Sequence, residues 1–227
     1  MATTDYIANV LRTYIDEPDQ TFVDNALLTR FLQIGYQEFR NRVMQCDPNI
    51  YATQAVYTLN NTTSLDLTTT NPDGAATPIL GPTSVNGSQL EMLIAIYRQE
   101  SNSAIPARIL NQVQNVQALE ATNNSFFFSN NSVTFSYSIS GTIRVSYVPS
   151  ANVDWTAAGG YIDDMTLFHD LIALYAYKQY AIVDAAENGP LISQLGKRES
   201  EFMQYLTSRT TGGPNYVQDV TSSILFL

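Results

Sequence analysis

The segment SVTFSYSISGTIRVSYV, residues 132–148, has the clearest β pattern in the chain. Apolar or aromatic residues alternate with Ser, Thr or Arg on both sides of Gly141: Val133, Phe135, Tyr137 and Ile139 before it, and Ile143, Val145 and Tyr147 after it. Strict alternation is typical of a strand with one buried and one solvated face, and a glycine permits a tight turn. The pattern predicts a β-hairpin that turns at Gly141.

The sequence around this hairpin also favours β structure. Between residues 49 and 150 there is no helical periodicity, and short β-like segments are separated by clusters of Asn, Gly, Pro and Thr. Three more strands are predicted, over residues 51–59, 91–99 and 104–110. Residues 60–87 are rich in turn-forming residues and predict an extended loop, and loops of this length usually contact a partner. We therefore predict a β-rich insert over residues 49–159.

Two helices are predicted before this insert. Thr4 or Asp5 can cap a short helix that ends near Ile15, and a longer helix follows over residues 22–44. In the longer helix the apolar residues recur at helical spacing and form one face for burial: Leu28, Phe31, Leu32, Phe39 and Val43. Gly35 interrupts this face. Because glycine costs helix stability relative to alanine, we expect another helix to pack closely against it.

Two more helices are predicted after the insert, over residues 163–187 and 191–209. Asp163 and Asp164 are placed to cap the first. Its apolar arc is broad enough for the central helix of a bundle: Leu167, Phe168, Leu171, Ile172, Leu174, Tyr175, Ala181 and Ile182. The second helix has one apolar face: Leu195, Phe202, Tyr205 and Leu206. The predicted fold class is α+β, a helical bundle formed by residues 1–48 and 160–210 around the β-rich insert, with an extended C-terminal tail over residues 211–227.

The composition favours an assembly protein over a nucleic-acid-binding protein. Charged residues make up only 14% of the chain, which fits a surface largely covered by neighbouring subunits, although an amide-rich soluble protein is an alternative. The net charge of -10 argues against neutralising phosphates. Cys46 is the only cysteine, so an intrachain disulfide and a multi-cysteine zinc site are excluded. The absence of a long apolar run predicts no membrane partner.

The sequence contains few candidates for catalytic residues. His169 is the only histidine, which excludes two-histidine metal motifs and triads with a second histidine. It lies near Asp163, Asp164 and Asp170, and helix capping explains these aspartates more simply than a metal site. No nucleotide-binding or hydrolase motif occurs. A carboxylate pair remains open, with nothing to select among Glu38, Asp66, Glu91 and Asp154. We predict no enzyme and no catalytic, metal or cofactor site.

The end of the sequence is apolar. After Gly212-Gly213-Pro214 comes a tail with seven apolar or aromatic residues: Tyr216, Val217, Val220, Ile224, Leu225, Phe226 and Leu227. Such a cluster is an aggregation hazard when exposed, so it is buried either on its own domain or on a partner. The second alternative makes these residues a candidate docking segment.

The layout as a whole resembles a known family, the head-to-tail adaptor (connector) proteins of tailed bacteriophages. Two N-terminal helices, a β-rich insert and two closing helices match it across nearly the whole chain. The local sequence is similar at IRVSYVP (residues 143–149), at Asp163-Asp164 and at HDLIALYAY (residues 169–177). The middle is longer than in compact adaptors, which points to an elaboration on the tail side or the shell side.

The resemblance implies a virion protein, assembled in the host cytoplasm, that forms a ring of twelve copies between the portal protein and a tail or nozzle protein. Double-stranded DNA would pass through this homo-oligomer without tight binding, and the C-terminal tail would reach the portal. One alternative is another virion tail or decoration module that binds through the β loops. A second is a carboxylate-dependent hydrolase, which would need a cleft with two acids of divergent pKa.

Overall fold

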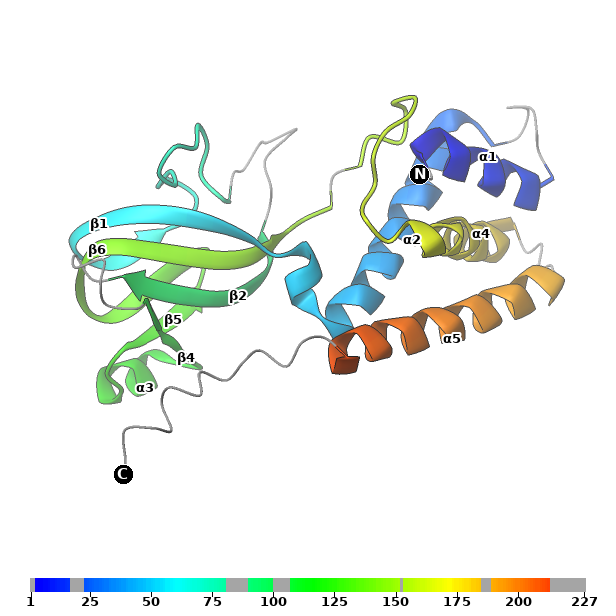
Figure 1. Ribbon diagram of the computed structural model, residues 1–227. Coiled ribbons are helices and arrows are strands. Elements are labelled where there is room, and N and C mark those ends of the chain that lie inside the picture. The colour runs from blue at the N-terminus through cyan, green and yellow to red at the C-terminus, as the bar shows by residue number, and fades with distance from the viewer. Residues whose placement is uncertain are drawn as a thin grey trace. The chain divides into compact units, whose positions relative to one another are not determined.

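The computed structural model describes residues 3–16, 23–80, 90–99, 107–151, 153–184 and 189–212. Its contacts divide the chain into two compact units, Met1–Asp47 with Val153–Leu227, and Pro48–Asn152. We call the first the helical unit and the second the β unit. Helices and strands are both abundant, so the predicted α+β class is confirmed (Figure 1).

The segment predicted as a hairpin is one continuous strand, β6 (Ser132–Pro149), so the hairpin prediction is wrong. Both halves of β6 pair antiparallel with β1 (Thr53–Asp66): Val133 lies opposite Leu65, and Ile143 lies opposite Tyr57. Gly141 has a φ of 112° and stays paired, opposite Leu59. The alternation keeps the same phase through Gly141, as one long strand requires.

The other strands flank β6 on its second edge and curl the sheet into a nearly closed, barrel-like form (Figure 1). β2 (Leu90–Gln99) pairs with the C-terminal half of β6, and β5 (Ser125–Ser129) pairs with its N-terminal half. β3 (Arg108–Ile109) pairs with β2, and β4 (Asn111–Val113) pairs in parallel with β5. Only Leu110 separates β3 from β4, and its N–H donates to the Ile96 carbonyl. This short connection therefore joins the β2 side of the sheet to the β5 side.

The interior of the β unit is filled by the inward residues of these strands. Tyr57, Ile96, Phe126, Val133 and Val145 are among its buried core residues. A short helix, α3 (Val116–Ala121), precedes β5, and the side chain of Asn115 caps it by accepting from the Ala118 N–H. A 3₁₀ turn, η1 (Pro48–Tyr51), precedes β1.

Several predictions for the β unit were incomplete or wrong. β1 continues to Asp66, so residues 60–66 are strand and not part of a loop; Asn61, at a φ of 51°, marks a register shift that keeps the two strands paired. α3, β4 and β5 were not predicted, although β5 contains the phenylalanine run 126–128. Residues 81–89 of the expected loop and residues 104–106 of an expected strand lie outside the described residues.

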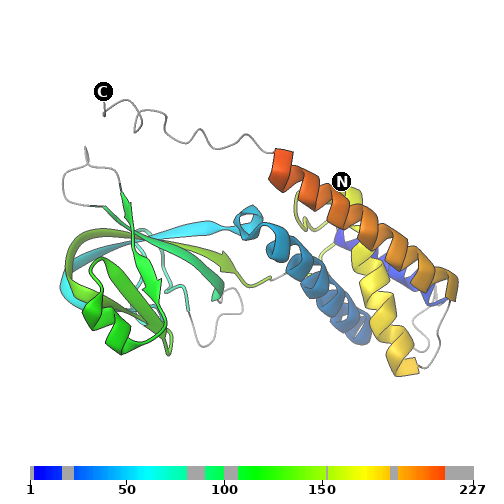
Figure 2. The same ribbon diagram turned by 90° about the horizontal axis from the view of Figure 1, so that it is seen from below.

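The described residues of the helical unit form four α-helices: α1 (Thr4–Tyr14), α2 (Asn25–Cys46), α4 (Asp170–Asp184) and α5 (Gly189–Gly212). α4 contacts each of the other three (Figure 2). Every residue from Leu171 to Tyr177 is buried, which confirms the prediction of a helix with a broad apolar surface. A 3₁₀ turn, η2 (Thr166–Phe168), leads into α4.

The buried faces of α2 and α5 agree with the predictions. The five apolar residues of the predicted α2 face are buried, and on α5 Leu195, Phe202 and Leu206 are buried. Gly35 lies so close to α4 that an added Cβ would stand 2.5 Å from the carbonyl oxygen of Ile172. The expected close approach of a second helix at Gly35 is confirmed.

Three predictions about the helix ends were wrong. α4 begins at Asp170 and not at residue 163, because residues 166–168 form η2 and shift the helical phase. Leu167 and Ile182, which were expected to be buried, are 73% and 67% exposed. Thr4 does not cap α1: its hydroxyl donates to the Ala157 carbonyl at 2.6 Å. Residues 185–188 and 213–227 lie outside the described residues, and with them the candidate docking segment 216–227.

Candidate functional site

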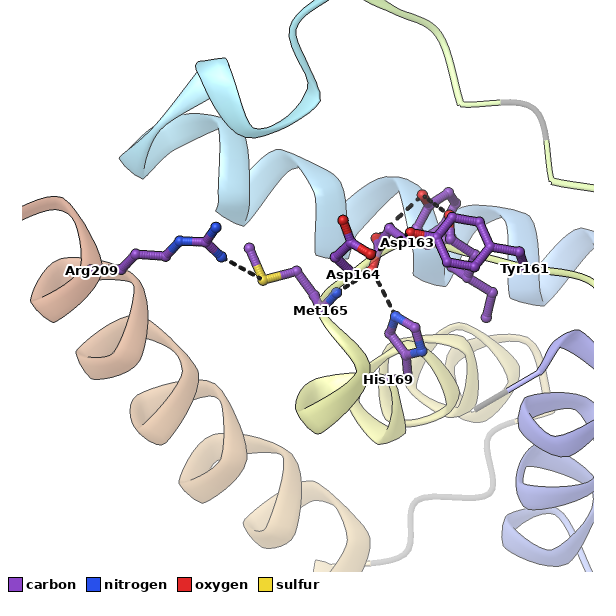
Figure 3. Close-up of polar contacts among 8 residues, drawn as sticks. Tyr161, Asp163, Asp164, Met165, His169 and Arg209 are labelled. Atoms are coloured by element: carbon purple, nitrogen blue, oxygen red, sulfur yellow. Dashed lines mark hydrogen bonds and ion pairs between the residues drawn. The ribbon is translucent and has the colours of Figure 1, made fainter. Parts of the chain in front are cut away.

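The polar centre of the helical unit is a buried pair formed by Asp163 and the single histidine (Figure 3). His169 Nε2 lies 2.7 Å from Asp163 Oδ1, and only 1% of His169 is exposed. The same carboxylate oxygen accepts from the Met165 N–H at 2.8 Å. Asp163 therefore holds the turn that leads into α4, and does not cap an α-helix as predicted.

α2 closes this centre from the other side. The Tyr36 hydroxyl lies 3.4 Å from Asp163 Oδ2. Burial, and then the charge of Asp163, raise the pKa of the Tyr36 phenol well above its usual value, so the group is a neutral donor at physiological pH. Phe39 packs edge-on against the His169 ring.

This geometry is unsuited to histidine-dependent catalysis. His169 Nδ1 is buried and has no hydrogen-bond partner in the described part of the chain, so no hydroxyl or thiol stands in the place of a nucleophile. Neither side chain of the pair opens to solvent. The arrangement is a structural hydrogen bond in a closed core.

The segment that leads to His169, residues 153–165, is attached to α1 and α2. Trp155 is buried and donates from Nε1 to Gln33 Oε1 at 3.0 Å. The Gly159 N–H donates to Asp5 at the start of α1. Part of the segment lies at the surface. Tyr161 is 61% exposed, and its hydroxyl donates to Asp164 at 2.6 Å.

Arg198 of α5 forms an extensive charged contact. Its guanidinium binds both carboxylate oxygens of Asp170, at 2.7 and 2.8 Å, and Glu201 at 2.8 Å. It also donates to the Leu167 carbonyl and lies over the Phe168 ring. Arg198 thereby fastens α5 to the first turn of α4, which explains Asp170 as a structural residue.

The four scattered acids of the hydrolase alternative are not brought together as a pair by any described contact. Glu38 lies 3.6 Å from Lys178 on the surface of the helical unit, and Asp154 accepts from the Thr156 N–H and hydroxyl. Asp66 is at the end of β1 opposite Ser132, whereas Glu91 is on β2 beside the other end of β6.

Concave surfaces of the helical unit could hold a ligand. One, of about 290 Å³, is lined by Asp5, Arg12, Asn25 and Trp155 among others, and the other, of about 460 Å³, runs along α2 from Ile34 to Gln45. Among the described residues, Asp5 is the only acid lining the first, and Glu38 the only acid lining the second. Neither provides the two facing carboxylates that glycoside hydrolysis requires.

Metal and membrane features are also lacking in what the structure describes. Among those residues no group of three or more His, Cys, Asp or Glu side chains could hold a metal ion. No described helix is both long and apolar enough to cross a membrane.

The sequence-based predictions missed the placement of the arginines of the β unit. Arg98, Arg108 and Arg144 are the only basic residues of the β unit. Arg98 lies directly opposite Arg108, whereas Arg144 lies opposite Tyr97, the residue before Arg98, and therefore on the other face of the sheet. The sequence shows that basic residues are scarce in this region, but only the strand register shows which of them share a face.

A comparison of the sequence with models of known protein families found no match. A comparison with curated proteins also found no significant similarity.

Proposed function

We propose that this chain is a structural virion protein, a head-to-tail adaptor that forms a ring of twelve copies between portal and tail and serves as a conduit for DNA. In this proposal α1, α2, α4 and α5 act as a helical bundle, the scaffold of the ring, and the β unit faces a neighbour. The observation that carries the proposal is the insertion layout. Helices from both ends of the chain pack around α4, and the chain between them forms one separate β unit.

The interior of the helical unit supports a scaffold role. Its single histidine is fixed in a closed core, and Arg198 joins two helices. Polar groups used in this way define one packing arrangement and leave no open catalytic centre. The chain is accordingly proposed to be a structural protein without enzymatic activity and without a cofactor.

The surface supports an assembly role. Large apolar side chains are exposed in both units, among them Tyr161 and Leu167 in the helical unit and Ile109 in the β unit. Exposed aromatic and aliphatic residues are typical of interface cores. Repeated around a ring, such contacts join one face of each copy to a different face of the next.

The net charge supports a conduit that does not retain DNA. A chain of charge -10 repels the phosphate backbone, and twelve copies multiply this effect. The purified protein is therefore expected to bind duplex DNA only feebly at physiological salt, and nanomolar affinity would contradict the conduit.

The apolar segment 216–227 is proposed, from its sequence alone, to dock on the portal by strand addition or by filling apolar grooves. Deleting the residues after Gly213 should leave the fold intact and abolish attachment to portal rings. A truncated protein that still binds portal would refute this part of the proposal and leave the adaptor function standing.

The function is tested by imaging and mass measurement of the full-length protein, alone and mixed with the portal protein of the same virion. Rings, or portal particles extended by a ring of this chain, are the expected result. A protein that stays a single copy in isolation and also fails to bind portal would overturn the proposal.

A further inference from the structure

The helical unit contains a buried cation whose described partners are all neutral. Arg12 of α1 is only 9% exposed. Its guanidinium donates to the Val23 carbonyl at 3.4 Å and to Asn25 Oδ1 at 2.8 Å. The group has more N–H donors than these two contacts use. Because a buried charge is costly without an opposite charge, Arg12 is suited to bind a further acceptor that is negatively charged.

The described acids on α1 and beside it do not supply this counter-charge. Asp5, Asp16 and Asp24 form no ion pair with Arg12 in the described part of the chain. Asp24 accepts from the Leu27 N–H as the N-cap of α2. Asp5 lies about two turns before Arg12 on the same helix and accepts from a backbone N–H of the segment 153–165. Within the described residues, Arg12 is therefore left without an anion.

Arg12 lines a concave surface of about 290 Å³, which we call the α1–α2 pocket. Its walls come from α1, from the first turns of α2 and from residues 155–156. Asn9 and Thr29 supply neutral polar groups, whereas Leu32 and Trp155 supply apolar surface. Ligand sites combine apolar walls with a few polar groups in this way, and a volume near the lower end of their range, roughly 300–1,000 Å³, fits a small ligand or a single side chain.

We propose that the α1–α2 pocket binds a carboxylate group, which pairs with the guanidinium of Arg12. The planar guanidinium suits a carboxylate because it can form two parallel hydrogen bonds with it. Hydrogen bonds from the Thr3 side chain and the Gly159 N–H hold the pKa of Asp5 below its usual value, so Asp5 is charged and should repel a second acid on the ligand. The ligand is therefore a monocarboxylate. This inference goes beyond the proposed assembly function and does not depend on it.

Inorganic phosphate is the competing ligand, and the pocket suits it less well. Phosphate sites commonly use the free N–H groups of a helix N-terminus. At the start of α2, however, the side chain of Asp24 already accepts from the Leu27 N–H. Among the described residues, Arg12 is the only basic side chain that lines the pocket. One cation among neutral groups matches the single charge of a carboxylate better than the higher charge of phosphate.

Trp155 allows a direct test in the full-length protein, because it lines the pocket and is the only tryptophan of the chain. Butyrate, added at constant ionic strength, should change the fluorescence of Trp155 saturably and raise the unfolding temperature. Butyramide has the same shape without the charge and should have neither effect. Succinate should bind more weakly than butyrate, because its second carboxylate is repelled by Asp5.

Substitutions identify the residue that holds the carboxylate. Arg12→Met should weaken butyrate binding by about tenfold or more, because hydrogen bonds to a charged group are lost. It removes a buried unpaired charge and should leave the chain folded, which circular dichroism checks. Arg12→Lys keeps the charge and should bind with intermediate affinity. Asp5→Asn keeps Arg12 and should narrow the difference between succinate and butyrate. Arg30→Met, the same substitution at an exposed arginine of α2, should bind butyrate like the wild type.

Mass photometry of the same samples identifies the source of the carboxylate. If butyrate and Arg12→Met also weaken association between copies, the carboxylate is an Asp or Glu side chain of a neighbouring copy. If association is unchanged, it belongs to a free small molecule.

Three results would overturn the inference: no response to butyrate or an equal response to butyramide, equal butyrate binding by the wild type and Arg12→Met, or binding of phosphate in place of butyrate. None of them bears on the ring, which the portal experiment tests separately.

Discussion

Gly35 of α2 lies against the backbone of Ile172 on α4, with room for a hydrogen atom and not for a methyl group: an added Cβ would stand 2.5 Å from the Ile172 carbonyl oxygen and 2.8 Å from the Ala176 nitrogen. Both neighbours are backbone atoms of a buried helix and cannot move aside alone. Gly35→Ala should therefore lower the free energy of unfolding by about 1–3 kcal/mol, in spite of the better helix propensity of alanine. Denaturant titration followed by circular dichroism measures this change.

A second glycine provides the control. Gly196 lies inside α5, and a Cβ added there would meet nothing within 4 Å. Gly196→Ala should raise stability by up to about 1 kcal/mol, because only helix propensity changes. If both substitutions stabilise the protein, the two helices are not as close at Gly35 as described.

In the helical unit, the buried faces could be predicted where apolar residues repeat at helical spacing along one segment. The apolar faces of α2 and α5 are repeats at helical spacing, and such a repeat is readable without knowing the partner helix. Leu167 shows the limit. It was assigned to the buried arc of a continuous helix, but the 3₁₀ turn at residues 166–168 rotates it outward.

The β unit was less predictable because its pairing is not local. The alternation of residues 132–148 was read correctly as strand, but whether Gly141 turns the chain or extends it depends on β1, about 80 residues earlier. The placement of the three arginines of the β unit depends on the same kind of information, since only strand register puts Arg98 opposite Arg108 and Arg144 on the other face of the sheet. The candidate docking residues 216–227 stay a prediction.

The Arg198 contact predicts a charge-specific loss of stability. Arg198→Met should cost about 1 kcal/mol, since a bidentate guanidinium–carboxylate pair is stronger than a simple surface pair but about 29% of the side chain is exposed and screened. Arg198→Lys should recover little, because an ammonium cannot reproduce the fork. Thermal unfolding at low and high salt measures the effect. The neighbouring Lys197→Met should be nearly neutral, and an equal loss there would contradict the assigned role.

Removing the Asp163–His169 contact should lower the free energy of unfolding more than removing the Arg198 contact. Asp163→Ala leaves the buried Nε2 of His169 and the Met165 N–H without their acceptor, and should lower the free energy of unfolding by about 3 kcal/mol. Asp163→Asn keeps a side-chain oxygen at that position and should retain much of the stability. Asp164→Ala, at the exposed neighbouring acid, should change it by less than about 0.5 kcal/mol. Similar losses for Ala at positions 163 and 164 would show that the pair does not hold the turn before α4.

The exposed acid Asp164 also predicts an observable titration. The Tyr161 hydroxyl donates a hydrogen bond to Asp164, and this bond is the main reason that the pKa of Tyr161 is raised to about 12. The difference in ultraviolet absorbance between the wild type and Tyr161→Phe isolates this one phenol among the 14 tyrosines. Asp164→Asn should return the titration toward the ordinary value of about 10.

The raised pKa of Tyr161 also makes the free energy of unfolding depend on pH in a defined direction. Because the folded pKa of Tyr161 lies above its unfolded value, the contribution of the Tyr161–Asp164 bond is complete below about pH 10 and is lost as the pH rises through about 12. The stability difference between the wild type and Asp164→Asn should therefore narrow over that interval, while Asp184→Asn should leave the titration of Tyr161 unchanged. A Tyr161 phenol that titrates normally in the wild type would mean that the hydroxyl does not donate to Asp164 in solution.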